Sequence, residues 1–125
     1  MTKGAEPLSG PGPVAGQLWL ELAPHAGGRA RRLLVFLHGA GTIPETYVPL
    51  ALAWQFKFPS AAAILLQGLM PGHTGAGRDW FDPRGTGYDQ RDGAIEAARE
   101  VNERIVQAAG KLGLDATRTA VIGFS

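Results

Sequence analysis

The chain ends in Gly123-Phe124-Ser125, a tripeptide whose residue types and spacing are typical of a nucleophilic serine. It is the front half of the motif Gly-x-Ser-x-Gly, the nucleophile elbow, in which a sharp strand-to-helix turn exposes the serine hydroxyl. We expect glycine at position 123 because a side chain there would collide with the tight turn. Acyl transfer by a serine also requires a base, a carboxylate that orients the base, and N–H donors for the oxyanion. Ser125 is therefore the candidate nucleophile.

A second segment, His38-Gly39-Ala40-Gly41, follows an apolar run and could supply an oxyanion donor. Its glycines allow the backbone to turn outward, so that the Ala40 N–H can face a substrate oxygen. A dinucleotide-binding fingerprint is the alternative interpretation, because Gly39 and Gly41 have the required Gly-x-Gly spacing. That fingerprint needs another glycine three residues after Gly41, where the sequence has Pro44. The pattern therefore favours an oxyanion loop.

Short apolar runs predict the strands that carry these motifs, over residues 18–22, 33–37, 61–66 and 119–122. We expect the last strand to be buried on both faces of a sheet. Because predicted helices alternate with these strands, the expected fold class is α/β, with a mostly parallel sheet and helices on both faces. Both motifs begin at the carboxyl ends of strands, where open α/β sheets form their sites.

Two helices are predicted between these strands. The first starts at Glu45 or Thr46 and ends before Pro59. The second runs from about Asp89 to Gly110, with Arg99–Glu103 and Glu100–Arg104 as possible ion pairs. Its apolar residues recur every three or four positions and predict one buried stripe. The stripe comprises Ile95, Ala98, Val101, Ile105, Ala109 and Leu112.

A long segment rich in Gly and Pro, residues 68–88, is predicted to be a loop. Loops of this length inside a domain are usually functional or disordered, and aromatic residues argue against disorder. Trp80 and Phe81 lie near its centre. They could line a substrate pocket, or they could fill the core beneath the loop.

Composition excludes several classes of function. The 125 residues carry a net charge of +1 without any block of like charges, so we expect no nucleic-acid partner. The absence of cysteine excludes disulfides, thiolate metal sites and a cysteine nucleophile. No apolar run is long enough to span a bilayer, and residues 1–16 resemble a flexible lead-in rather than a signal peptide. The predicted location is cytoplasmic.

Three segments together resemble the phospholipase/carboxylesterase branch of the α/β-hydrolases, which includes bacterial carboxylesterases and acyl-protein thioesterases. They are Leu37–Gly41, Gly77–Phe81 and Val121–Ser125, and the resemblance covers about residues 33–125. It implies a serine esterase without metal or cofactor that cleaves a small-molecule carboxylic ester, lysophospholipid or thioester through an acyl-enzyme. The positions that it implies are Ser125 as nucleophile, the Ala40 N–H as oxyanion donor, and His38, Gly39, Gly41, Trp80 and Phe81 around the substrate.

The chain departs from this family where it stops. The family's acid, histidine and second oxyanion donor follow the serine. We therefore interpret residues 17–125 as the amino-terminal half of an α/β-hydrolase domain, truncated at the nucleophile elbow and inactive alone. A terminal carboxylate at Ser125 would also repel the oxyanion. The unpaired strand edge makes the fragment prone to aggregation, and the sequence leaves its oligomeric state open.

Upstream residues are poor substitutes for the missing acid and base, because the family's base follows the serine. We interpret three histidines and three aspartates as loop-bracing or solvated. These are His25, His38, His73, Asp79, Asp82 and Asp89. The alternative function is a non-catalytic pseudo-hydrolase or binding module that uses the loop over residues 68–88.

Overall fold

A computed structural model describes residues 18–84 and 87–124, with the backbone alone for residues 87–89. The predicted lead-in over residues 1–16 and the candidate nucleophile Ser125 lie outside the described residues. The larger sheet has the strand order β1-β3-β2-β6. β2 pairs in parallel with β3 and β6, whereas β1 pairs antiparallel with β3, which confirms the predicted mostly parallel sheet. The strands are β1 (Trp19–Leu22), β2 (Arg32–Leu37), β3 (Ala61–Leu66) and β6 (Thr119–Gly123).

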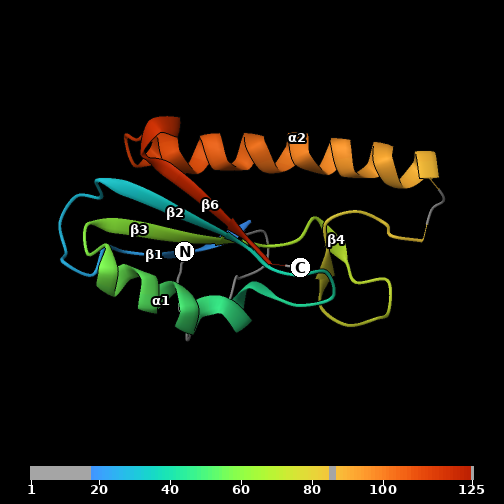
Figure 1. Cartoon of the computed structure of the whole chain (residues 1–125), viewed down its shortest axis with the longest axis horizontal. Coiled ribbons are helices and arrows are strands. Elements are labelled where there is room, and N and C mark those ends of the chain that lie inside the picture. The colour runs from blue at the N-terminus through green and yellow to red at the C-terminus, as the bar shows by residue number, and fades with distance from the viewer. Residues whose placement is uncertain (1–17, 85–86, 125) are drawn as a thin grey trace, which may run out of the picture.

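Two helices cover opposite faces of this sheet, as predicted (Figure 1). They are α1 (Val48–Lys57) and α2 (Gly87–Lys111). A short 3-10 turn, Pro44–Tyr47, precedes α1, so the α-helix starts later than the sequence suggested. Pro49 lies in the first turn of α1, where its missing N–H costs no intrahelical bond.

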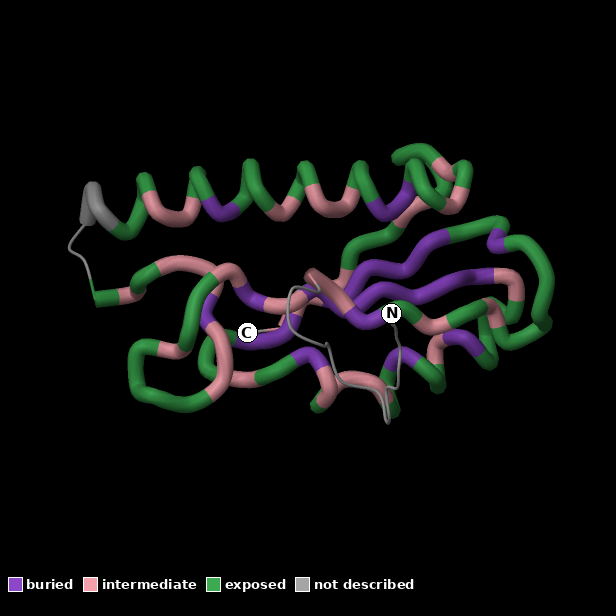
Figure 2. The backbone as a smooth tube through the Cα atoms, turned by 180° about the vertical axis from the view of Figure 1, so that it is seen from behind, coloured by how far each residue is buried: buried purple, intermediate pink, exposed green. Residues whose placement is uncertain are grey.

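The core is divided between the two faces because side chains alternate along each strand. Leu33 and Val35 of β2 pack on the α2 side, whereas Leu34 and Phe36 pack on the α1 side. All six residues of β3 are buried, and Figure 2 shows this burial along the centre of the sheet. The buried central strands β2 and β3 thus form a fixed support for the candidate site at their carboxyl ends.

The apolar stripe of α2 is only partly as predicted. Val101 and Ile105 pack toward the sheet, whereas Ile95 is 47% exposed and Ala98 is also exposed. The first turns of α2 extend past the end of the larger sheet (Figure 1). Ile95 lies on the same helix face as Arg99 and Val106, which are exposed as well. Buried positions that the pattern missed are Ala97 and Ala108.

The predicted ion pairs on α2 have a mixed outcome. Arg104 Nε lies 3.2 Å from Glu100 Oε2, as expected. Arg99 pairs with Glu96, one turn toward the helix start, instead of with Glu103. Both arginines therefore bond a carboxylate on their amino-terminal side.

The prediction that the last strand is buried on both faces is wrong for the described chain. Among the described strands β6 pairs only with β2, so it forms an edge of the sheet. Val121 is 52% exposed, and Ala120 is exposed as well. An apolar run identifies a strand without showing whether neighbouring elements cover it, which is why the pattern misled here.

The segment over residues 68–88 contains more structure than the predicted loop. β4 (Met70–Pro71) and β5 (Arg78–Asp79) form a small antiparallel hairpin, and α2 already begins at Gly87. A further bridge joins Arg78 to Thr42, at the end of the oxyanion loop. The hairpin is therefore attached to the segment that carries the candidate oxyanion donor. In the described residues, no helix has both the length and the apolar character needed to cross a membrane.

Candidate active site

Two neighbouring strands bring the predicted oxyanion loop and the serine motif together. Leu37 is the register partner of Gly123, so β2 and β6 end side by side. The Phe124 N–H continues this pairing by donating to the Leu37 carbonyl at 3.1 Å. His38 and Phe124, the residue before Ser125, thus leave the sheet at the same end. This juxtaposition is what an oxyanion loop and its nucleophile require.

The oxyanion loop makes a tight turn at residues 39–42. The Thr42 N–H donates to the Gly39 carbonyl at 3.1 Å, and Gly41 has a φ of +78°. A positive φ at the third residue is the mark of a type II turn and explains the glycine there. Ala40 is exposed, and its N–H has no recorded acceptor among the described residues. It is therefore available as a donor.

His38 lies beneath this turn and is only 2% exposed. The Gly68 N–H donates to its Nε2 at 2.9 Å, so the ring proton is on Nδ1, which donates to the Gly39 carbonyl at 2.9 Å. Burial lowers the pKa of His38 below its ordinary value and keeps the ring neutral. With both nitrogens bonded to backbone, His38 fits the loop-bracing interpretation, although its ring also borders a cavity.

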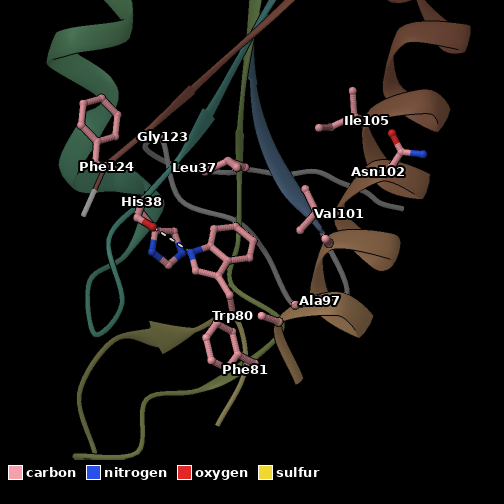
Figure 3. Close-up of a pocket in the computed structure, with 12 residues that line it drawn as sticks. Leu37, His38, Trp80, Phe81, Ala97, Val101, Asn102, Ile105, Gly123 and Phe124 are labelled. Atoms are coloured by element: carbon pink, nitrogen blue, oxygen red, sulfur yellow. Dashed lines mark hydrogen bonds between the residues drawn. The ribbon is translucent and has the colours of Figure 1, made fainter. Parts of the chain in front are cut away.

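Trp80 also holds His38 in place, through the His38 carbonyl. Its indole N–H donates to the His38 carbonyl at 2.8 Å, and the two rings lie 4.8 Å apart (Figure 3). Trp80 also packs against the core on the α2 side. Trp80 therefore fills the core and also borders a cavity, and its role in binding a substrate stays a prediction.

A cavity of about 600 Å³ lies between α2 and the end of the sheet. In Figure 3 the side chains of Trp80 and Phe81 face residues of α2 across it, whereas Phe124 points away toward α1. Its wall is predominantly apolar. The lining residues are Leu37, His38, Trp80, Phe81, Ala94, Ala97, Ala98, Val101, Asn102, Ile105, Gly123 and Phe124.

The hairpin clamps the oxyanion loop through its backbone. The Gly41 N–H donates to the Arg78 carbonyl at 2.9 Å, and the Arg78 N–H donates to the Thr42 carbonyl at 2.8 Å. Arg78 Nε also donates to the Gly68 carbonyl at 3.1 Å. At Gly77 the approach is so close that a Cβ would lie 2.2 Å from the Gly41 oxygen. Only glycine fits this contact.

Asp79 holds the hairpin together and is 1% exposed. Its Oδ2 accepts the His73 N–H at 3.0 Å and lies 2.9 Å from His73 Nδ1. These bonds, that of the backbone N–H above all, lower the pKa of Asp79 below its ordinary range. Asp79 Oδ1 has no partner among the described atoms. The loop-bracing interpretation is thus supported for both residues; Asp79 is buried rather than solvated, whereas His73 is also exposed at the surface.

The remaining candidates lie at the surface. Asp82 forms an exposed ion pair with Arg84, which lowers the pKa of the Asp82 carboxyl. His25 is exposed and contacts the ring of Phe56. The side chain of Asp89 lies outside the described residues. Within the described parts of the chain, no group of three or more His, Cys, Asp or Glu side chains could hold a metal ion.

Sequence reasoning missed Tyr47 and Thr42. The Tyr47 ring stacks on Phe124 at 4.4 Å, and its hydroxyl lies 3.5 Å from the Gly39 N–H. Tyr47 therefore connects the serine motif to the oxyanion loop. The Thr42 hydroxyl donates to the Gly39 carbonyl at 2.6 Å. A threonine directly after His-Gly-x-Gly was the available signal, because Ser and Thr hydroxyls often bond nearby turn backbone.

The expected collision at Gly123 is not found in the described part of the chain. A Cβ built on this glycine meets nothing within 4 Å. The described residues therefore do not show why this position is glycine.

Comparisons with known proteins show what the chain is similar to. The chain is 32% identical over 97 residues to the esterase YpfH of Escherichia coli (strain K12), covering 77% of this chain and 42% of that protein. The crystal structure of esterase PE8 superposes with a TM-score of 0.74 at 23% identity, over 83% of this chain and 50% of that one. A carboxylesterase from Mesorhizobium loti superposes with a TM-score of 0.69 at 24% identity, over 92% and 53%.

The fold is therefore that of the α/β-hydrolases, as the sequence predicted. The chain spans about half the length of the relatives that it matches. The family model for phospholipases and carboxylesterases matches residues 24–125, which is most of the sequence. The chain belongs to the phospholipase/carboxylesterase family.

Proposed function

We propose that this chain carries the nucleophile and one oxyanion donor of a serine esterase that hydrolyses carboxylic esters through an acyl-enzyme on Ser125. The proposed substrates include lysophospholipids, which are carboxylic esters, and thioesters, which undergo the same acyl transfer with a thiol as leaving group. The observation that carries the proposal is the pairing of Leu37 with Gly123, because it starts the oxyanion loop and the serine turn at adjacent strand ends.

In the proposed reaction the Ser125 hydroxyl attacks the ester carbonyl carbon while a base removes its proton. The carbonyl oxygen becomes an oxyanion and accepts a hydrogen bond from the Ala40 N–H. Collapse of this intermediate expels the alcohol, which takes the proton back from the base, and leaves the acyl group on Ser125. Water then hydrolyses the new ester and restores the Ser125 hydroxyl. The base, its carboxylate and a second N–H donor are expected after Ser125, as in the family that the chain resembles.

Ester turnover tests this proposal. We would compare the 125-residue chain with the product of the complete reading frame that contains it, here called the complete gene product. The expected result is hydrolysis of a short p-nitrophenyl ester by the complete gene product, loss of turnover in its Ser125→Ala variant, and no turnover by the 125-residue chain. Turnover that survives Ser125→Ala would refute the assignment of the nucleophile.

The same experiment separates the enzyme from a non-catalytic binding module. A module of that kind would bind without turnover, and its complete gene product would be inactive in both the original and the Ser125→Ala form. Turnover by the 125-residue chain that Ser125→Ala abolishes would support the nucleophile and overturn the expected inactivity of the isolated chain.

A further inference from the structure

The Gly39 carbonyl accepts three hydrogen bonds in the oxyanion loop. The Thr42 hydroxyl donates to it at 2.6 Å and the Thr42 N–H at 3.1 Å. The third donor is His38 Nδ1–H, at 2.9 Å. Thr42 therefore supplies two of the three bonds, and its hydroxyl makes the shortest of them.

The orientation of this carbonyl decides the direction of the Ala40 N–H. The two groups belong to the same peptide unit, which is planar and trans, so the N–H points opposite to the C=O. The three donors hold the Gly39 oxygen toward the interior of the turn. The Ala40 N–H is consequently directed outward, and Ala40 is exposed.

The same bonds also affect the strength of the donor. Hydrogen bonds to the oxygen of a peptide polarise it and make its N–H a better donor, because chains of hydrogen bonds reinforce one another. A neutral His38 and the Thr42 hydroxyl thus act on the Ala40 N–H without touching a substrate.

Thr42 is itself fixed in place. The Arg78 N–H donates to its carbonyl at 2.8 Å, and its Oγ1 lies 3.3 Å from His38 Nδ1. The hydroxyl is therefore held between the hairpin and the buried imidazole, in a position that a mobile surface threonine would not keep.

We propose that Thr42 is a positioning residue for the oxyanion donor: its hydroxyl orients and polarises the peptide whose N–H is that of Ala40. The inference rests on the proposed function of Ser125 and Ala40. Because an oxyanion donor acts mainly in the transition state, Thr42 should influence kcat more than KM.

Kinetics of the complete gene product test this role with two matched variants. Thr42→Val keeps the side-chain shape and the backbone N–H but removes the hydroxyl, whereas Thr42→Ser keeps the hydroxyl. We expect Thr42→Val to lower kcat about fivefold, the scale of one hydrogen bond, and to change KM less than twofold. Thr42→Ser should recover most of the loss. Active-site titration excludes misfolded enzyme from each value.

The amide resonance of Ala40 gives a readout that does not depend on activity. Its proton should shift upfield in Thr42→Val and return in Thr42→Ser.

An active protein in which Thr42→Val changes neither kcat per active site nor this resonance would overturn the inference while leaving the proposed function intact. A complete gene product without esterase activity would refute the proposed function, and the resonance would still test the role of Thr42. A lower thermal midpoint with unchanged kcat and unchanged resonance would show a purely structural role and overturn the inference.

Discussion

At the scale of single residues, Gly77 of the hairpin lies too close to Gly41 of the oxyanion loop for any side chain to fit between them. A Cβ on Gly77 would lie 2.2 Å from the Gly41 oxygen, and Gly77 has a φ of +62°. We expect Gly77→Ala to lower the free energy of unfolding by about 3 kcal/mol, from combined overlap and backbone strain. Urea denaturation measures this value.

Gly75→Ala is the matched control for that substitution. Gly75 also has a positive φ, of +89°, but a Cβ there meets nothing within 4 Å. Its expected cost is about 1 kcal/mol, from the backbone conformation alone. Equal losses in the two variants would show that the contact between the hairpin and the oxyanion loop is not the cause.

His38 should make stability depend on pH. Its pKa in the folded chain lies below the ordinary value of about 6.5, because burial disfavours the charged ring. Below about pH 6.5 the unfolded chain therefore binds a proton on His38 while the folded chain still has the neutral ring. Stability is therefore fully present above about pH 6.5 and is lost as the pH falls toward the folded pKa. We expect the urea midpoint to fall between pH 7 and pH 5, and to fall less in His38→Gln. Parallel pH curves for the two proteins would contradict this account.

At the scale of secondary-structure elements, the free edge of β6 is the main liability of the described chain. Exposed strand edges with apolar side chains promote association, and Val121 is 52% exposed on this strand. We expect the 125-residue chain to associate as its concentration rises, and Val121→Lys to suppress this. Sedimentation velocity measures the effect.

Val106→Lys is the control, because Val106 is 61% exposed but lies on α2. It should leave association unchanged. A monodisperse wild-type monomer, or equal suppression by both lysines, would refute the role of the strand edge.

The cavity beside α2 belongs to the same scale. Parallel strands are joined by right-handed crossovers, so the direction in which the chain moves across the sheet fixes the face that the connecting helix covers. The chain moves from β3 past β2 to β6, and α2 covers the face that this direction requires. A helix that follows Ser125 and leads to a strand beyond β6 would lie on this same face, over the cavity. We therefore propose that this helix fills the cavity, which would make Ala98 a packing residue.

Ala98→Glu tests that assignment. Ala98 is exposed in the described chain and lines the cavity, so the substitution should scarcely change the thermal midpoint of the 125-residue chain. In the complete gene product the buried charge should cost about 2–4 kcal/mol. Gln107→Glu, on the opposite side of α2, should be neutral in both proteins. A neutral Ala98→Glu in the complete gene product would contradict the proposal.

At the scale of the whole molecule, the sequence predicted the elements with strong local signals. The apolar runs of β2 and β3 and the glycines of the oxyanion loop required no knowledge of distant contacts. The β4–β5 hairpin could not be predicted in this way, because its two-residue strands depend on two long-range backbone bonds. The Gly41 N–H donates to the Arg78 carbonyl, and the Arg78 N–H donates to the Thr42 carbonyl. The exposure of Ile95 likewise depends on which face of α2 contacts the rest of the chain, and the apolar spacing alone does not fix that face.

The most direct test of the central claim is covalent labelling of the complete gene product with a fluorophosphonate, followed by mass spectrometry of its peptides. The account predicts one adduct on Ser125, formed by the wild-type protein and absent from Ser125→Ala. Labelling elsewhere, or an unlabelled protein whose reading frame stops directly after the Ser125 codon, would contradict the claim that this chain supplies the nucleophile of a serine esterase.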